Sequence, residues 1–240
     1  SSAASDVYKR QVGIQPDILV LRTEYELSLA LRKKVALFCN VDPAAVIQSI
    51  DVPSIYEVPL KMHQQHLDEI VLTKTGLPIN GEPHLEPWLN FLHRMKNATK
   101  TVRIGLVGKY VELPDAYKSI NESLFQAATY NDRKLDLQYI HSEKLNSGNV
   151  DAMLSSLDGV LIAPGFGQRG IEGKFIALKY AREHDIPTFG VCLGMQCMVI
   201  EYARDVLGYT DANSTEMDVT TKHNVIDLME EQKSITNMGG

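Results

Sequence analysis

The chain has 240 residues, of which 44% are hydrophobic and 22% are charged, and its formal net charge is −6. This composition is typical of a globular protein with an ample core, and the negative balance disfavours a nucleic-acid partner. No apolar run approaches the roughly 18 residues of a membrane span, so we expect no membrane partner. Three cysteines without paired spacing or a metal-ligand pattern favour a cytoplasmic location.

The first part of the chain lacks a regular alternation of strands and helices. Residues 1–11 have neither an apolar signal core nor helical periodicity, and we interpret them as a non-native or disordered leader. Residues 12–96 read as the C-terminal part of a domain that begins upstream. The strands predicted in this region are 17–21 and 46–50, and the predicted helices are 27–38, 55–64, 67–74 and 85–95.

Residues 97–101 are polar and unpatterned, and we interpret them as a linker. Residues 102–240 form the second predicted domain, in which strands alternate with helices. The predicted strands are 102–107, 135–140, 159–163 and 188–191, and the predicted helices are 116–130, 150–156, 171–184 and 195–207. Buried strands separated by helices indicate an α/β fold with a doubly wound, mostly parallel sheet.

The segment GVCLGMQ, residues 190–196, is the most informative part of the sequence. It places Cys192 at a sharp strand-to-helix turn, with a glycine two residues before it and another two residues after it. The positive end of the helix dipole favours the thiolate, which is the nucleophilic form. We therefore predict that Cys192 attacks an amide; a small buried hydrophobe is the alternative.

The segment APGFGQRG, residues 163–170, also follows a strand and precedes a helix. It therefore lies at the same carboxyl edge of the predicted sheet as Cys192. A tetrahedral oxyanion needs hydrogen-bond donors, and we predict the backbone N–H groups of Gly165 and Leu193 for this role. A nucleotide-phosphate loop is the alternative, although the segment matches neither GxxxxGK[ST] nor GxGxxG.

The elbow segment resembles that of triad-type (class I) glutamine amidotransferases, and five further blocks resemble the CTP synthase family. These blocks are residues 13–19, 36–41, 108–119, 166–173 and 213–216. The resemblance covers about residues 12–240 in order. It implies a flavodoxin-like class I amidotransferase domain preceded by the truncated end of a P-loop-type α/β synthase domain.

The resemblance also implies a reaction and its partners. A cysteine thiolate hydrolyses glutamine, and the ammonia displaces a phosphate that ATP has placed on the 4-oxygen of UTP, which gives CTP. GTP stimulates the glutamine half, CTP inhibits, and the family forms homotetramers. ATP and Mg²⁺ act at a site mostly outside this chain, no cofactor is covalently bound, and we assign no metal ligand here.

The family's site residues carry over to matching positions of this sequence. Cys192 matches the nucleophile, and Gly165 and Leu193, with the neighbouring Phe166, match the oxyanion region. Gln196 and Glu216 match residues that hold glutamine. In the first region, three residues match nucleotide contacts: Arg22 for ATP, Lys34 for the UTP phosphates and Asp51 for a position near the adenine.

The sequence departs from the family pattern in two places. The proline of the oxyanion loop is shifted by one position, which gives Ala163-Pro164-Gly165 where the family has two glycines after the proline. The family's general base, a His-x-Glu segment, has no match, because His223 is the only histidine after Cys192 and we expect it on the surface. We therefore expect an internal fragment that is inactive alone.

Two other readings remain open on the sequence alone. A γ-glutamyl hydrolase would have a similar elbow, but it would not explain residues 12–96. A non-enzymatic binding module would keep the fold with a degenerate site and an ordinary cysteine.

Overall fold

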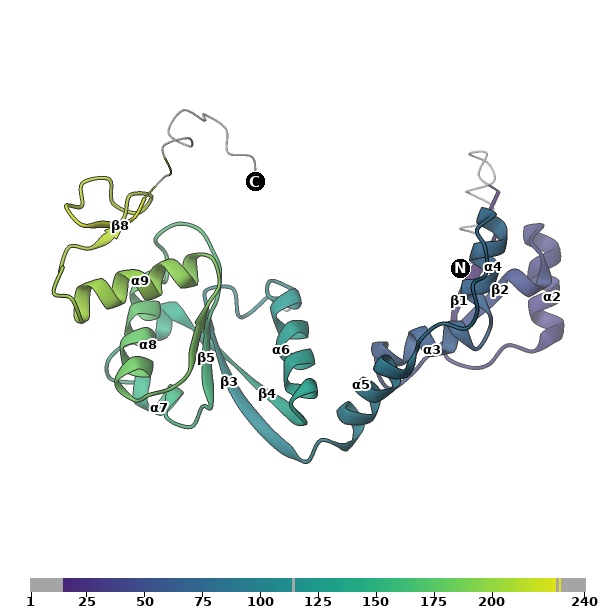
Figure 1. Ribbon diagram of the computed structural model, residues 1–240, viewed down its shortest axis with the longest axis horizontal. Helices are drawn as coiled ribbons and strands as arrows, with labels where there is room; N and C mark the ends of the chain where they lie inside the picture. The colour runs from purple at the N-terminus through teal and green to yellow at the C-terminus, as the bar shows by residue number, and fades with distance from the viewer. Residues whose placement is uncertain (1–14, 114, 228, 230–240) are drawn as a thin grey trace. The chain divides into compact units, whose positions relative to one another are not determined.

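The computed structural model describes residues 15–113, 115–227 and 229. The chain divides into two compact units, Ser1–Leu92 and His93–Gly240, which Figure 1 colours from purple to teal and from teal to yellow. The leader that we predict at residues 1–11 lies outside the described residues.

The first unit contains a two-stranded parallel sheet of β1 (Leu19–Thr23) and β2 (Val46–Ile50). Helix α2 (Leu29–Cys39) connects the two strands and packs its Ala36 against them. The remaining elements are η1 (Pro43–Ala45), η2 (Ile55–Glu57), α3 (Val58–His63), α4 (Leu67–Thr75) and the first part of α5 (Glu86–Asn97), a helix that crosses the boundary between the two units.

The sequence predicts one helix over 55–64, whereas the structure divides this stretch between η2 and α3. The physical reason is Pro59, which lies in the first turn of α3. Proline has no N–H to continue a preceding helix, but it fits the first turn of a new one. The prediction of a single continuous helix here is therefore wrong.

The second unit is built on a parallel sheet with the strand order β4-β3-β5-β6. The strands are β3 (Lys100–Gly108), β4 (Arg133–His141), β5 (Gly159–Ile162) and β6 (Thr188–Gly190). All three pairings are parallel, so the carboxyl ends of the strands share one edge of the sheet.

Helices cover both faces of this sheet (Figure 1). Helix α6 (Lys118–Tyr130) packs on the face that carries Leu106 and Leu161. Helices α7 (Val150–Leu154), α8 (Ile171–Glu183) and α9 (Leu193–Asp205) pack on the opposite face, which carries Val107 and Ile162. The alternation of side chains along each strand therefore supplies two cores. The predicted doubly wound α/β fold is confirmed.

The end of the described chain adds a short parallel pair, β7 (Asn213–Ser214) and β8 (Asn224–Ile226), where the sequence shows no regular pattern. The segment that we predict as a linker, 97–101, holds the end of α5 and the start of β3, so the domain boundary stays a prediction. Among the described residues, no helix is both long enough and apolar enough to span a bilayer.

A half-buried ion pair joins α8 to α9. The Arg182 guanidinium donates through Nε and Nη2 to the Glu201 carboxylate, at 3.1 and 2.7 Å from Oε1. The Glu201 side chain is only 4% exposed, against 32% for Arg182. Removing the arginine would leave a desolvated carboxylate without its cation, which costs more than an exposed pair is worth.

We predict that Arg182→Met lowers the free energy of unfolding of the second unit by about 2 kcal/mol, because the Glu201 charge loses its partner. The matched control is Lys179→Met on the same helix. It breaks the more exposed 3.2 Å pair with Asp205 and should cost less than about 0.5 kcal/mol. Hydrogen exchange of α8 and α9 peptides in urea measures the free energy of unfolding of each variant. Equal losses of stability in the two variants would contradict the prediction.

Candidate active site

Cys192 connects β6 to α9 at the carboxyl edge of the sheet. It occupies the N-cap of α9 with φ 52° and ψ −112°, a left-handed conformation that costs energy for a residue with a side chain. The preceding Val191 N–H is fixed by the Ile162 carbonyl at 3.1 Å. The cysteine is exposed, so it is not the buried hydrophobe that the alternative reading requires.

The glycines around Cys192 are required by close approach of the backbone. A Cβ on Gly190 would lie 2.5 Å from the carbonyl carbon of Gly194, and a Cβ on Gly194 would lie 2.1 Å from the Ile162 carbonyl oxygen. Neither neighbour is a flexible side chain that could move away. The start of α9 therefore sits directly against the ends of β5 and β6, with the cysteine between the two glycines.

The loop 163–170 lies beside the start of α9. A Cβ built on Gly165 would be 3.7 Å from the Leu193 side chain, so the two predicted oxyanion residues are neighbours. Neither backbone N–H donates a hydrogen bond within the described part of the chain. Gly167 and Gly170 have φ of 70° and 76°, which turns the loop into the N-terminus of α8, and Phe166 is 80% exposed at its tip.

Gln196 and Glu216 differ in their surroundings. The Gln196 side-chain Oε1 is buried, and within the described ranges it has no hydrogen-bond partner. Its backbone N–H donates to the Cys192 carbonyl at 3.1 Å, so it lies one turn into α9. Glu216 is exposed, and its segment is tied to the glycine loop by the Gln168 amide, which donates to the Met217 carbonyl at 2.7 Å.

Two buried lysines reach the same loop, and neither is among the site residues predicted from the sequence. Lys174 on α8 donates from Nζ to the Ala163 carbonyl at 2.7 Å, and Lys109, just after β3, donates to the Phe166 carbonyl. The Lys109 ammonium therefore contacts the glycine loop of its own unit. For Lys174, the signal available in the sequence is a lysine that lies at helical spacing among the apolar residues of α8.

In the first unit, the structure pairs two of the three predicted nucleotide contacts with each other. Arg22 donates to the Asp51 carboxylate from Nη2 at 2.5 Å and from Nε at 2.9 Å. Both side chains are at least half exposed, so they remain accessible to a ligand. Lys34 is exposed on α2 and makes no ion pair with another described residue.

His223 is exposed, as the sequence leads us to expect, and its ring bonds Asp211. The ring Nδ1 lies 2.6 Å from Asp211 Oδ1, and the ring stacks on Tyr209. This hydrogen bond lowers the pKa of the Asp211 carboxyl. The described contacts of His223 are therefore structural.

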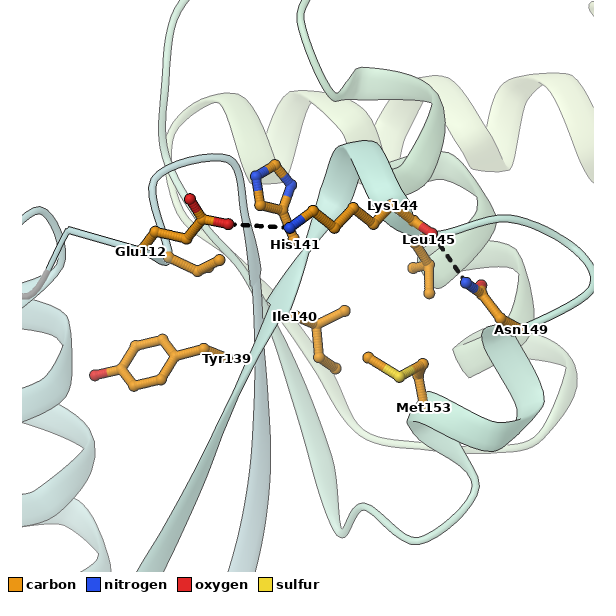
Figure 2. Close-up of a pocket in the computed structure, with 9 residues that line it drawn as sticks. Glu112, Tyr139, Ile140, His141, Lys144, Leu145, Asn149 and Met153 are labelled. Carbon is orange, nitrogen blue, oxygen red and sulfur yellow. Dashed lines mark hydrogen bonds and ion pairs between the residues drawn. The ribbon is translucent and has the colours of Figure 1, made fainter.

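A separate pocket of about 390 Å³ lies at the carboxyl end of β4 (Figure 2). Its wall is apolar, with Ile140, Leu145 and Met153, and an ion pair between Lys144 and Glu112 at 3.0 Å spans its rim. This pair lowers the pKa of the Glu112 carboxyl. None of the predicted site residues lines this pocket, so it is distinct from the Cys192 elbow.

Residues 112–239 match the family model described as glutamine amidotransferase class-I, which is more than half of the chain. The chain belongs to this family. A second model, described as CTP synthase N-terminus, matches residues 3–77. The amidotransferase match agrees with the exposed cysteine elbow, and the second match accounts for the first region, which a γ-glutamyl hydrolase would leave unexplained.

The curated relatives of this family member carry the name CTP synthase. The proteins of Bacteroides fragilis and Porphyromonas gingivalis are 68% and 63% identical over 231 residues, which is 96% of this chain. The chain spans only 43% of the length of either relative. A solved structure, the glutaminase domain of Trypanosoma brucei CTPS with bound acivicin, is 40% identical with a TM-score of 0.52, covering 58% of this chain and 54% of that one.

We predict that iodoacetamide at pH 8 labels Cys192 in the folded protein and leaves Cys39 and Cys197 unmodified. Cys192 is exposed, whereas Cys39 and Cys197 are 7% and 0% exposed, and burial raises the pKa of the Cys197 thiol to about 11. Peptide mass spectrometry reads the labels, and unfolding in urea should release all three cysteines. Labelling of Cys197 as fast as Cys192 in the folded protein would contradict the arrangement.

Proposed function

We propose that this chain carries the glutaminase site of a CTP synthase and that Cys192 is its nucleophile. The observation that carries the proposal is the exposed cysteine in a strained strand-to-helix turn, beside two backbone N–H groups that lack partners among the described residues. The names of the relatives and the match of both family models support the same assignment.

The proposed reaction begins with attack of the Cys192 thiolate on the side-chain carbonyl carbon of glutamine. The N–H groups of Gly165 and Leu193 stabilise the oxyanion, and such donors are worth several kcal/mol of barrier. Cleavage of the C–N bond, with one proton taken up from water by the leaving nitrogen, releases ammonia and leaves a thioester. Water then hydrolyses the thioester to glutamate, which returns the thiolate and releases two protons to solvent. We assign no general base among the described residues.

Gln196 and Glu216 suit the substrate's polar groups. The buried, unpartnered Oε1 of Gln196 is an acceptor that a bound ligand N–H would satisfy, since an unpaired buried acceptor is costly. The Glu216 carboxylate has no partner among the described residues, and it can pair with the α-ammonium group of glutamine. The Gln168 bond to Met217 would then hold both halves of the glutamine site together.

The finer assignments belong to the same proposal. Ammonia would aminate UTP activated by ATP, with GTP as activator, CTP as inhibitor, a homotetramer as the assembly and the cytoplasm as the location. Arg22, Lys34 and Asp51 would contact the nucleotides. The described residues contain no group of three or more His, Cys, Asp or Glu side chains fit to hold a metal ion.

The glutamine site is tested by covalent labelling with acivicin. We predict that acivicin labels Cys192, and that glutamine protects this cysteine whereas asparagine does not. We also predict that Gln196→Leu slows the labelling roughly tenfold, because a polar contact with the ligand is lost. The control is Met195→Leu, an exposed neighbour on the same helix, which should label normally. Equal protection by asparagine and glutamine would contradict a glutamine site.

The coupling to CTP formation is tested in a full-length protein that contains this chain. We predict that Cys192→Ala abolishes glutamine-dependent CTP formation and preserves formation from added ammonia, because only the first route needs the nucleophile. The absorbance change from UTP to CTP measures both routes. Loss of the ammonia-dependent reaction to the same extent would contradict separate amidase and synthase sites.

A further inference from the structure

Two lysine ammonium groups from different parts of the chain donate hydrogen bonds to the loop that follows β5. Lys174 on α8 is 1% exposed and donates to the Ala163 carbonyl at 2.7 Å, and Lys109 after β3 is 7% exposed and donates to the Phe166 carbonyl. These two carbonyls bracket Pro164 and Gly165. The Lys109 side chain also passes beneath the loop, since a Cβ on Gly165 would lie 3.5 Å from its Cε.

Neither lysine forms an ion pair with a carboxylate of a described residue, although the Lys109 ammonium lies 5.2 Å from the centroid of the Tyr110 ring. No carboxylate of a described residue lies within ion-pair distance of Lys174, and the titratable groups that affect it are Lys109, Cys197 and Cys192. Burial lowers the pKa of the Lys174 ammonium. A desolvated cation with one hydrogen bond is a poor source of stability, and an apolar side chain of similar length would cost less to bury.

The two lysines instead fix the conformation of the predicted oxyanion loop. The Ala163 N–H is fixed by the Val107 carbonyl at 2.9 Å, so the Lys174 bond completes the anchoring of that residue. Beyond it, Pro164 has no N–H, and the Gly165 N–H donates to no described residue. The peptide groups around Gly165 therefore depend on the two lysines for their orientation, since the loop's own backbone supplies no bonds there.

We propose that Lys174 and Lys109 are positioning residues that hold loop 163–167 in its oxyanion-binding conformation by binding the carbonyls at its two ends. This inference rests on the proposed glutaminase function. It assigns the lysines no contact with substrate. It implies that Lys174 contributes to the rate of amide attack while contributing little or nothing to the stability of the fold.

The test compares two probes of Cys192 in the full chain. The chloroketone analogue of glutamine forms a thioether with loss of chloride, and its carbonyl passes through a tetrahedral oxyanion. Iodoacetamide alkylates the same sulfur by loss of iodide and needs no oxyanion donor. We expect Lys174→Met and Lys109→Met each to slow the chloroketone roughly tenfold or more, with iodoacetamide within about twofold of the unaltered protein.

The matched control is Lys179→Met, which removes an exposed lysine from the same helix and should change neither rate. Thermal unfolding should show Lys174→Met at least as stable as the unaltered protein. If that variant does not fold, Lys109→Met decides the question at the other end of the loop. Equal slowing of both probes, or no slowing of the chloroketone, would overturn the inference.

Failure of the proposed function gives a different result. In that case the unaltered protein itself would react with the chloroketone at Cys192 without protection by glutamine. If protection is present in the unaltered protein and the lysine variants react at the same rate, the glutaminase site stands and only the positioning role is lost.

Discussion

The second unit depends on how closely α9 approaches the ends of β5 and β6. The backbone of Gly194 touches the Ile162 carbonyl, and Gly190 touches the backbone of Gly194, so there is no room for any side chain at either position. This contact forces Cys192 into a left-handed conformation and holds its side chain at the exposed edge of the sheet. The surrounding packing must hold the strained backbone in place, because an isolated turn would relax to an unstrained conformation.

Several features around this elbow reduce the stability of the folded state. Lys174 is buried without a carboxylate, Gln196 buries an acceptor without a described partner, and Cys192 holds a strained backbone angle. Each feature costs free energy in the folded state. Their concentration at one sheet edge contrasts with the Arg182–Glu201 pair between α8 and α9, where a buried charge is fully matched and the role is structural.

Much of the second unit could be predicted from the sequence. The four strand predictions of residues 102–191 fall on β3, β4, β5 and β6, because buried parallel strands are short apolar runs between amphipathic helices. The short β7–β8 pair could not be predicted, since two or three residues carry no measurable periodicity. The single helix predicted over residues 55–64 is divided in the structure because Pro59 lies in the first turn of a second helix and cannot continue the first.

The elbow could be recognised from residues 190–196 alone, since a cysteine between two spaced glycines at a strand end allows few other backbone paths. The family could also be identified from the sequence, because the blocks that resemble it extend along almost the whole chain. The side chains that surround the elbow, in contrast, come from distant parts of the chain and are brought there by folding. Lys109 and Lys174 are 65 positions apart and meet one loop because β3 lies next to β5 while α8 packs across them. Such contacts arise from packing between distant segments, which no local pattern encodes.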